Sequence, residues 1–252
     1  MKLVLFDIDG TLIAHKDKTT QIGFPRFSYA IKKVYGVSID FSAISEYNGC
    51  VDKQIVRSVV PEAVFSQKEF DIRWPGIRDA LLEYAVKQAS DGKQLYEPIE
   101  DAVSLAMLLH ENQHYQIGLL TGNVEKIARW KLKHAGIPNI FSLELFSDQF
   151  DNRIDLAKSV FEKYRTKFQC DMQPNNIVVI GDSIHDIRCG KAIGAKTIAV
   201  ATGVSTGVGG IHGGSQYKKN LENEHPEVLV ESLMDKPVLD LFGLNRVQQE
   251  KL

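Results

Sequence analysis

Four short apolar runs, each followed by a turn-forming residue and a helical pattern, organise this chain. They are rich in Val, Ile and Leu and lie at residues 2–8, 115–123, 176–183 and 196–203. Because their hydrophobicity is continuous rather than alternating, both faces of each predicted strand are covered, as in a buried parallel sheet. The pattern predicts an α/β fold, a Rossmann-like three-layer sandwich with right-handed crossovers. Ligands of such sheets gather at the carboxyl ends of the strands.

The segment after the first run has a different pattern. Residues 24–36, 51–60 and 75–89 have helical periodicity, and no convincing strand is found between Ala14 and Gly92. Pro75 and Gly76 predict a break, with the proline in the first turn of a helix. So long a segment exceeds an ordinary loop. We therefore predict a Rossmann-like core at 1–13 and 94–252, with an inserted helical cap at 14–93 above the strand ends.

Composition narrows the choice of partners and compartment. The chain has 252 residues and a formal net charge of −2, so no global field favours nucleic acid or an anionic membrane as a partner. Cys50, Cys170 and Cys189 form no CxxC pair, which argues against a disulfide framework or a zinc ribbon. The first apolar run is too short for a signal peptide or a membrane span. We expect a cytoplasmic protein.

Carboxylates follow two of the predicted strands. Asp7 and Asp9 end the first run, and Asp182 and Asp186 follow the third. If these strands are neighbours, the acids converge, and two carboxylates ~4 Å apart repel by about 4 kcal/mol at an effective dielectric near 20. A cation is therefore implied. A carboxylate site without paired His or Cys suits Mg²⁺.

Anion-binding groups follow the second strand. Thr121 offers a hydroxyl, Gly122 and Asn123 offer backbone N–H groups, and a helix follows with its positive end. Further on, Arg153 or Lys158 could neutralise phosphate oxygens. A metal, an anion cradle and a further carboxylate together describe phosphoryl transfer.

In order along the chain, these stretches resemble the four motifs of the haloacid dehalogenase superfamily. "DIDGT" resembles the first motif, Thr121 the second and "GDSIHD" the fourth, over residues 1–13 and 94–205. A helical cap after the first motif is similar to the phosphoglycolate phosphatase-like branch. Haloacid dehalogenases proper lack the second acid, so Asp9 favours phosphate monoester chemistry.

The resemblance implies roles for these residues. Asp7 would be the nucleophile that forms an aspartyl-phosphate, and Asp9 the general acid and then base, with its main-chain carbonyl facing the metal. Asp7 and Asp182 would hold Mg²⁺, with Asp186 as a further ligand or a supporting acid. The third motif is usually a lysine, whereas the equivalent stretch here reads "NRID". Arg153 is preferred for that role and Lys158 is the alternative.

A competing motif is "HENQH", residues 110–114, in which His110 and His114 could bind zinc with Glu111 as general base. Its position before a strand, opposite the strand ends, argues against a metallopeptidase. His185 is interpreted as a polar neighbour of the acids. Surface helix charge is the preferred interpretation of three cap residues that could otherwise contact a leaving group: Asn48, Lys53 and Arg57. The glycine-rich segment 202–215 lacks the ending of a Walker loop and predicts a surface excursion.

The sequence thus predicts a Mg²⁺-dependent phosphatase acting on a small phosphorylated metabolite. A phosphomutase of the same superfamily, or a noncatalytic regulatory protein that retained the fold, stays open. Neither the substrate nor the oligomeric state can be read from the residues.

Overall fold

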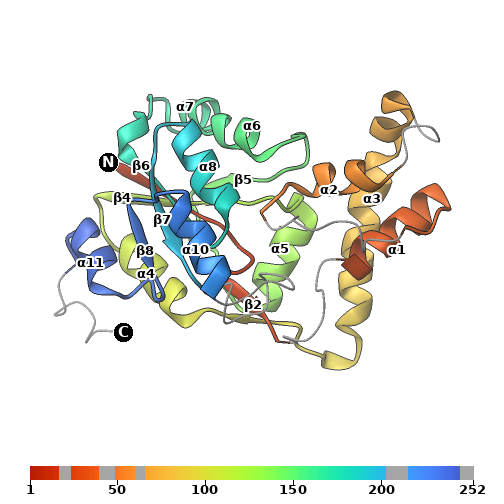
Figure 1. The fold of residues 1–252 in the computed structure, drawn as a ribbon, viewed down its shortest axis with the longest axis horizontal. Helices are drawn as coiled ribbons and strands as arrows, with labels where there is room; N and C mark the ends of the chain where they lie inside the picture. The colour runs from red at the N-terminus through yellow and green to blue at the C-terminus, as the bar shows by residue number, and fades with distance from the viewer. Residues whose placement is uncertain (17–23, 40–48, 61–65, 203–214, 245–252) are drawn as a thin grey trace.

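The computed structural model describes residues 1–16, 24–39, 49–60, 66–202 and 215–244 (Figure 1). Its centre is a parallel sheet of six strands in the order β5-β4-β1-β6-β7-β8. The strands are β1 (Lys2–Phe6), β4 (Tyr115–Leu120), β5 (Leu143–Leu145), β6 (Ile177–Gly181), β7 (Lys196–Val200) and β8 (Val228–Val230). The four predicted runs are β1, β4, β6 and β7.

Both faces of the sheet are buried, which explains the continuous apolar runs. Along β1, Val4 and Phe6 pack on one face and Leu3 and Leu5 on the other, and all four are fully buried. The first face is covered by α4 (Glu100–His110), α5 (Glu125–His134) and α11 (Lys236–Phe242). The second face is covered by α6 (Arg153–Lys158), α7 (Val160–Phe168) and α8 (Ile184–Ala192), with α10 (Ser215–Asn223) packed on α8. The predicted three-layer α/β fold is confirmed.

Three helices from the early part of the chain build a separate apolar cluster beside the sheet (Figure 1). They are α1 (Phe24–Tyr35), α2 (Asp52–Val59) and α3 (Gln67–Gln88). Phe27, Val56 and Phe70 are fully buried in this cluster. Helix α5 belongs to both parts, because Ile127 joins the cluster while Trp130 packs against it and against the sheet core. The apolar cluster of the early helices therefore packs against α5.

Pro75 does not break a helix, contrary to the sequence-based expectation. Helix α3 runs without interruption through Pro75, a position where proline removes one backbone hydrogen bond at a cost of about 3 kcal/mol. Phe70, Trp74 and Ile77 on either side are buried against α1 and α5. Burying each such side chain contributes about 1.5–3 kcal/mol, so packing outweighs the local preference. A capping box at Ser66 begins the helix well before the proline.

A short strand also stands where no strand was expected. β2 (Ile13–His15) pairs antiparallel with β3 (Tyr96–Pro98) at the two crossings between the sheet and the early helices. Each strand has three residues, which is too short to show a period of two. The pairing joins segments far apart in the chain, so only the folded structure reveals it. The described residues also include the one-turn 3₁₀ helices η1 (Ser90–Gly92) and η2 (Pro174–Asn176).

Within the described ranges, no helix has the length and apolar character needed to cross a membrane. Asn48 and residues 203–214 of the glycine-rich segment lie outside those ranges, so the expectations for them stand as predictions.

Candidate active site

The sheet order brings three motif-bearing strand ends together. β1 lies between β4 and β6, and Phe6 pairs with Leu119 on one side and Ile180 on the other. Asp7, Thr121 and Asp182 follow these neighbouring strands, so their backbones meet at one edge of the sheet. The convergence that the sequence analysis required is therefore present.

Three carboxylates gather at this edge. Asp7, Asp182 and Asp186 each offer an oxygen, and these atoms lie within 4.8 Å of one another; no other such group of acids, His or Cys is found in the described part of the chain. Two glycines make the approach possible. A Cβ on Gly181 would lie 2.0 Å from Cγ of Asp186, and one on Gly10, whose φ is +79°, would lie 2.2 Å from Oδ2 of Asp182.

The loop carrying these acids is fixed by local hydrogen bonds. Ser183 caps α8, accepting from the backbone N–H of Asp186, while Asp186 Oδ2 accepts from the Ser183 backbone at 3.0 Å. From α10, the buried hydroxyl of Tyr217 donates to the main-chain carbonyl of Asp182. Tyr217 was not foreseen, because a tyrosine after a glycine-rich segment carries no motif.

Arg153 lies among the acids, whereas Lys158 does not. The Arg153 guanidinium is 4% exposed, forms an ion pair with Asp186, and has Nη2 at 3.0 Å from Oδ1 of Asp7. It also donates to the carbonyls of Gly49 and Leu120, at 2.8 and 3.1 Å. The Lys158 side chain is 59% exposed and pairs with Asp155 on its own helix.

The charges of this group do not balance. Three carboxylates face one guanidinium, and Oδ1 of Asp7, although 3.0 Å from Nη2 of Arg153, accepts no hydrogen bond of good geometry from any described residue. Burial, opposed by Arg153 and reinforced by Asp186 and Asp9, raises the pKa of Asp7 to about 7, and burial raises the pKa of Asp182 well above its ordinary value. Buried carboxylates with unmet charge and only oxygen donors fit a hard divalent cation such as Mg²⁺.

Asp9 occupies a separate position beside this group. Its Oδ1 and Oδ2 accept from Nζ of Lys131 at 2.7 and 2.6 Å, and Oδ2 also accepts from Nδ2 of Asn123 at 2.6 Å. Burial would raise the pKa of Asp9, but the charges of Lys131 and Arg26 outweigh it and hold that pKa below its usual value. Without substrate, the Asp9 carboxylate is therefore an anion, and the three-acid group does not include it.

The residues that were expected to bind an anion are buried. Thr121 is fully buried, and its hydroxyl accepts from the backbone and side-chain amides of Asn123, at 3.3 and 2.9 Å. The carbonyl of Gly122 accepts from the backbone N–H of Asp52 at 2.7 Å. A Cβ on Gly122 would lie 2.2 Å from the Cys50 carbonyl oxygen, so the early helices approach the strand end closely here.

The side chain of Asp52 was missed by the sequence analysis. It lies in the first turn of α2, is 1% exposed, accepts from the Val124 N–H at 2.9 Å and pairs with Arg26 at 2.9 Å. Of the three early residues that were interpreted as surface charges, Lys53 is instead buried, where it pairs with Asp71 and Asp151, and Arg57 lies over the Phe70 ring. An Asp in a first helical turn is common, so no sequence signal distinguished it.

The "HENQH" stretch does not form the geometry of a zinc motif. Helix α4 ends at His110, and His114 lies in the turn that follows. The main-chain carbonyl of His114 accepts a hydrogen bond from the N–H of Lys2. The two histidines therefore do not share one helical face. His185, interpreted as a polar neighbour of the acids, has Nε2 at 3.7 Å from Sγ of Cys50.

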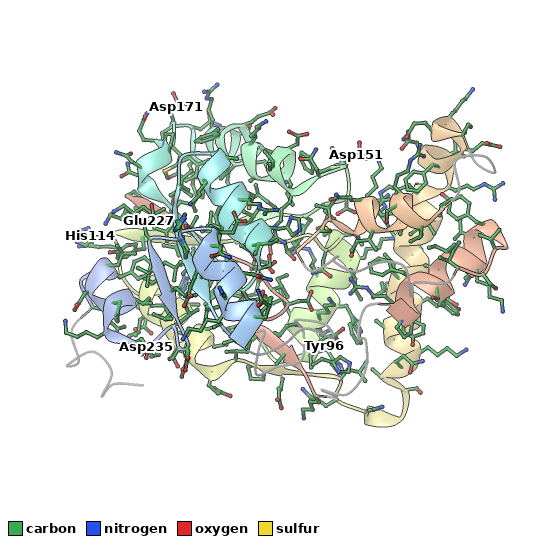
Figure 2. All side chains as sticks on the ribbon, in the orientation of Figure 1. Tyr96, His114, Asp151, Asp171, Glu227 and Asp235 are labelled. Atoms are coloured by element: carbon green, nitrogen blue, oxygen red, sulfur yellow. The ribbon has the colours of Figure 1, made fainter. Side chains whose placement is uncertain are left out.

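Figure 2 shows side chains filling the space between the sheet and its helical layers, with Tyr96 near the crossing to the early helices. Tyr96 is buried beneath Lys131, whose Nζ lies 5.5 Å from the ring centroid. Lys131 was missed as well, after Tyr217 and Asp52, because a lysine in an amphipathic helix ordinarily indicates a solvated face.

A parallel sheet with buried carboxylates at its carboxyl edge defines the class of fold: a Rossmann-like α/β protein, in which ligands ordinarily bind at the strand ends. Residues 4–200 match the family model for haloacid dehalogenase-like hydrolases. The chain belongs to this family, and the predicted superfamily and hydrolase class are confirmed.

Relatives and solved structures agree with this assignment. The chain is 23% identical over 241 residues to pyrophosphatase PpaX of Halalkalibacterium halodurans, covering 96% of each chain. A hydrolase from Pseudomonas syringae has a TM-score of 0.61 at 16% identity, covering 99% of each chain. A β-phosphoglucomutase from Clostridium difficile has a TM-score of 0.61 at 17% identity, covering 96% of each. At these identities the structures show a shared fold.

Proposed function

We propose that this protein is a Mg²⁺-dependent phosphatase that hydrolyses a small phosphomonoester through an aspartyl-phosphate on Asp7. The observation that carries the proposal is the buried group of Asp7, Asp182 and Asp186 around Arg153, with Asp9 beside it. A noncatalytic protein would have no reason to keep buried acids with unmet charge at a cost to stability.

Asp7 would hold the metal together with Asp182 and Asp186, and the Asp9 main-chain carbonyl would face it. When bound, Mg²⁺ would neutralise the carboxylates and the phosphate, so that an anionic nucleophile can approach. An oxygen of Asp7 would attack phosphorus, and the bond from phosphorus to the leaving oxygen would break. The negative charge of the bound phosphate would raise the pKa of Asp9, so that Asp9 takes up a proton, which it would then give to the leaving oxygen. The Asp9 carboxylate left behind would take a proton from the water that attacks phosphorus, and phosphate would be released from Asp7.

Other groups would bind the phosphate. The Thr121 hydroxyl and the amides of Gly122 and Asn123 are suited to its oxygens. Arg153 supplies a fixed guanidinium within reach of Asp7, which supports it over Lys158 in the third-motif role. We further propose that residues 14–93 act as a cap that excludes water from the first step, since α2 contacts the strand ends through Asp52.

The substrate is proposed only as a class, a small phosphorylated metabolite in the cytoplasm. The relatives named pyrophosphatase make inorganic pyrophosphate a candidate within the same chemistry. The structural likeness to a β-phosphoglucomutase keeps a phosphomutase as the second candidate. A mutase would return the phosphoryl group from Asp7 to another hydroxyl of the same substrate.

The test compares the parent protein with Asp7→Asn and with a matched exposed variant, Asp79→Asn. Phosphate release from p-nitrophenyl phosphate, pyrophosphate and a panel of phosphorylated metabolites is measured with and without Mg²⁺. Turnover that needs Mg²⁺, survives in Asp79→Asn and disappears in Asp7→Asn is expected. Unchanged turnover in Asp7→Asn would show that the nucleophile is wrongly assigned. Isomerised sugar phosphate without release of phosphate would favour the mutase.

A further inference from the structure

Lys131 is a buried lysine in the core-facing part of α5. Its side chain is 2% exposed, and its helical neighbours Ala128 and Leu132 belong to the apolar core of the sheet. Burying an ammonium costs several kcal/mol unless it is paired and hydrogen-bonded. An apolar residue would suit this position better for stability alone, so the lysine needs another explanation.

All the hydrogen-bonding capacity of this ammonium is directed at two residues. Nζ donates to both oxygens of Asp9, at 2.7 and 2.6 Å, and to Oδ1 of Asn123 at 2.9 Å. An ammonium has three donors, and these contacts use all of them. Asn123 closes the triangle by donating from Nδ2 to Asp9 at 2.6 Å. Lys131, Asp9 and Asn123 therefore form a closed hydrogen-bonded triad.

The triad fixes where the Asp9 carboxylate points. With both oxygens held from α5, the side chain stays apart from the group formed by Asp7, Asp182 and Asp186. Without Lys131, one hydrogen bond from Asn123 would remain, and a carboxylate held by one contact can rotate. A proton donor must lie within hydrogen-bond reach of the leaving oxygen, so loss of this orientation would impair proton transfer more than binding.

We propose that Lys131 is a positioning residue that holds Asp9 at the angle from which it protonates the leaving group. The proposal rests on the phosphatase function given above. It assigns a role to a residue that neither binds phosphate nor contacts the three-acid group. Its distinctive consequence is that substrates whose leaving oxygen most needs a proton depend most on Lys131.

The experiment uses the full chain with Mg²⁺ and compares Lys131→Met with Lys133→Met, an exposed lysine on the same helix. Two substrates are assayed: p-nitrophenyl phosphate, whose leaving phenolate needs little protonation, and an alkyl phosphate, whose leaving alkoxide needs it. In Lys131→Met, we expect kcat for the alkyl phosphate to fall about 10²-fold or more, by the usual contribution of a general acid, with KM within about threefold. For p-nitrophenyl phosphate the fall should be less than about tenfold. Lys133→Met should match the parent.

Equal losses of kcat for the two substrates, or no loss, would overturn the proposal. Lys131→Arg provides a second variant that retains the charge and two or more hydrogen-bond donors. Its ratio of kcat for the alkyl phosphate to kcat for p-nitrophenyl phosphate should equal that of the parent. If Lys131→Met folds poorly, the result for Lys131→Arg decides. A ratio of kcat values equal to the parent's supports the proposal, and a selective loss of kcat for the alkyl phosphate contradicts it. A parent that hydrolyses neither substrate would instead refute the phosphatase function. A crystal structure of Lys131→Met with Asp9 in its parental orientation would refute the positioning role independently of activity.

Discussion

The charge imbalance around Asp7 predicts how the metal-free protein responds to pH. The buried carboxyl of Asp7 has its pKa raised from 3.8 to about 7. The folded state therefore holds this proton more tightly than the unfolded chain does. The contribution of Asp7 to stability is fully present below pH 3.8 and is lost as the pH rises through about 7. At higher pH the ionised carboxylate costs about 4 kcal/mol in the fold, at 1.36 kcal/mol per pKa unit.

Asp7→Asn removes the ionisable proton while keeping nearly the same shape. The variant should be more stable than the parent in the absence of metal, and its advantage should grow by about 2–3 kcal/mol between pH 5 and pH 8. Any effect of the amide that does not depend on pH is the same at both pH values. The change with pH in the difference in unfolding free energy between variant and parent therefore reports only the titration of Asp7. For a chain of this size, that change corresponds to about 5–10 °C in Tm.

The assay is urea unfolding in EDTA at pH 5 and pH 8, followed by circular dichroism. Asp79→Asn, at a side chain that is 62% exposed, serves as the control whose difference from the parent should change little. Adding Mg²⁺ at pH 8 should stabilise the parent more than Asp7→Asn, because an ion that binds only the folded state raises its stability. A difference between parent and Asp7→Asn that is independent of pH would refute the reasoning about the buried acid.

Four further predictions concern the site and one helix of the early segment. Arg153→Met should lower kcat/KM for p-nitrophenyl phosphate by about 10²-fold or more, by analogy with the loss of one charge-stabilising donor, and Lys158→Met should leave it unchanged in the same assay. Gly122→Ala should destabilise the protein by about 1–3 kcal/mol in urea unfolding, because its Cβ would lie 2.2 Å from the Cys50 carbonyl oxygen. Gly76→Ala should instead stabilise it by about 1 kcal/mol, because its helical position has only ordinary contacts with a side chain at 3.5 Å. Chelation of divalent ions should abolish phosphate release and added Mg²⁺ should restore it; release that persists in excess EDTA would contradict the metal assignment.

The sequence determined the four central strands and the residues that follow them, whereas the short strands β5 and β8 were not predicted. Continuous apolar runs predicted β1, β4, β6 and β7 because a strand buried on both faces has no polar positions. The carboxylates could be found because each follows such a run directly. The preference for Arg153 over Lys158 was also available from position, since Arg153 begins α6 and Lys158 ends it.

Other features depended on contacts between distant segments. Pro75 lies inside α3 because packing against α1 and α5 outweighs a local preference, and β2 pairs with β3, which follows the early helices in the chain. No local sequence pattern predicts either the uninterrupted helix or the strand pairing. The same is true of Asp52, whose carboxylate accepts from a backbone N–H next to α5.

Lys131 shows most clearly the difference between what the sequence predicts and what the tertiary structure decides. In the sequence it is one of several charged residues on a helix, and its charge predicts exposure. Only the fold brings it into contact with Asp9, 122 positions earlier in the chain, where a buried ammonium is stable because a carboxylate and an amide accept its hydrogen bonds. Residue types and their order thus determined which chemistry was possible at the strand ends, and tertiary packing decided how the reacting groups are held, because orientation depends on neighbours from distant parts of the chain.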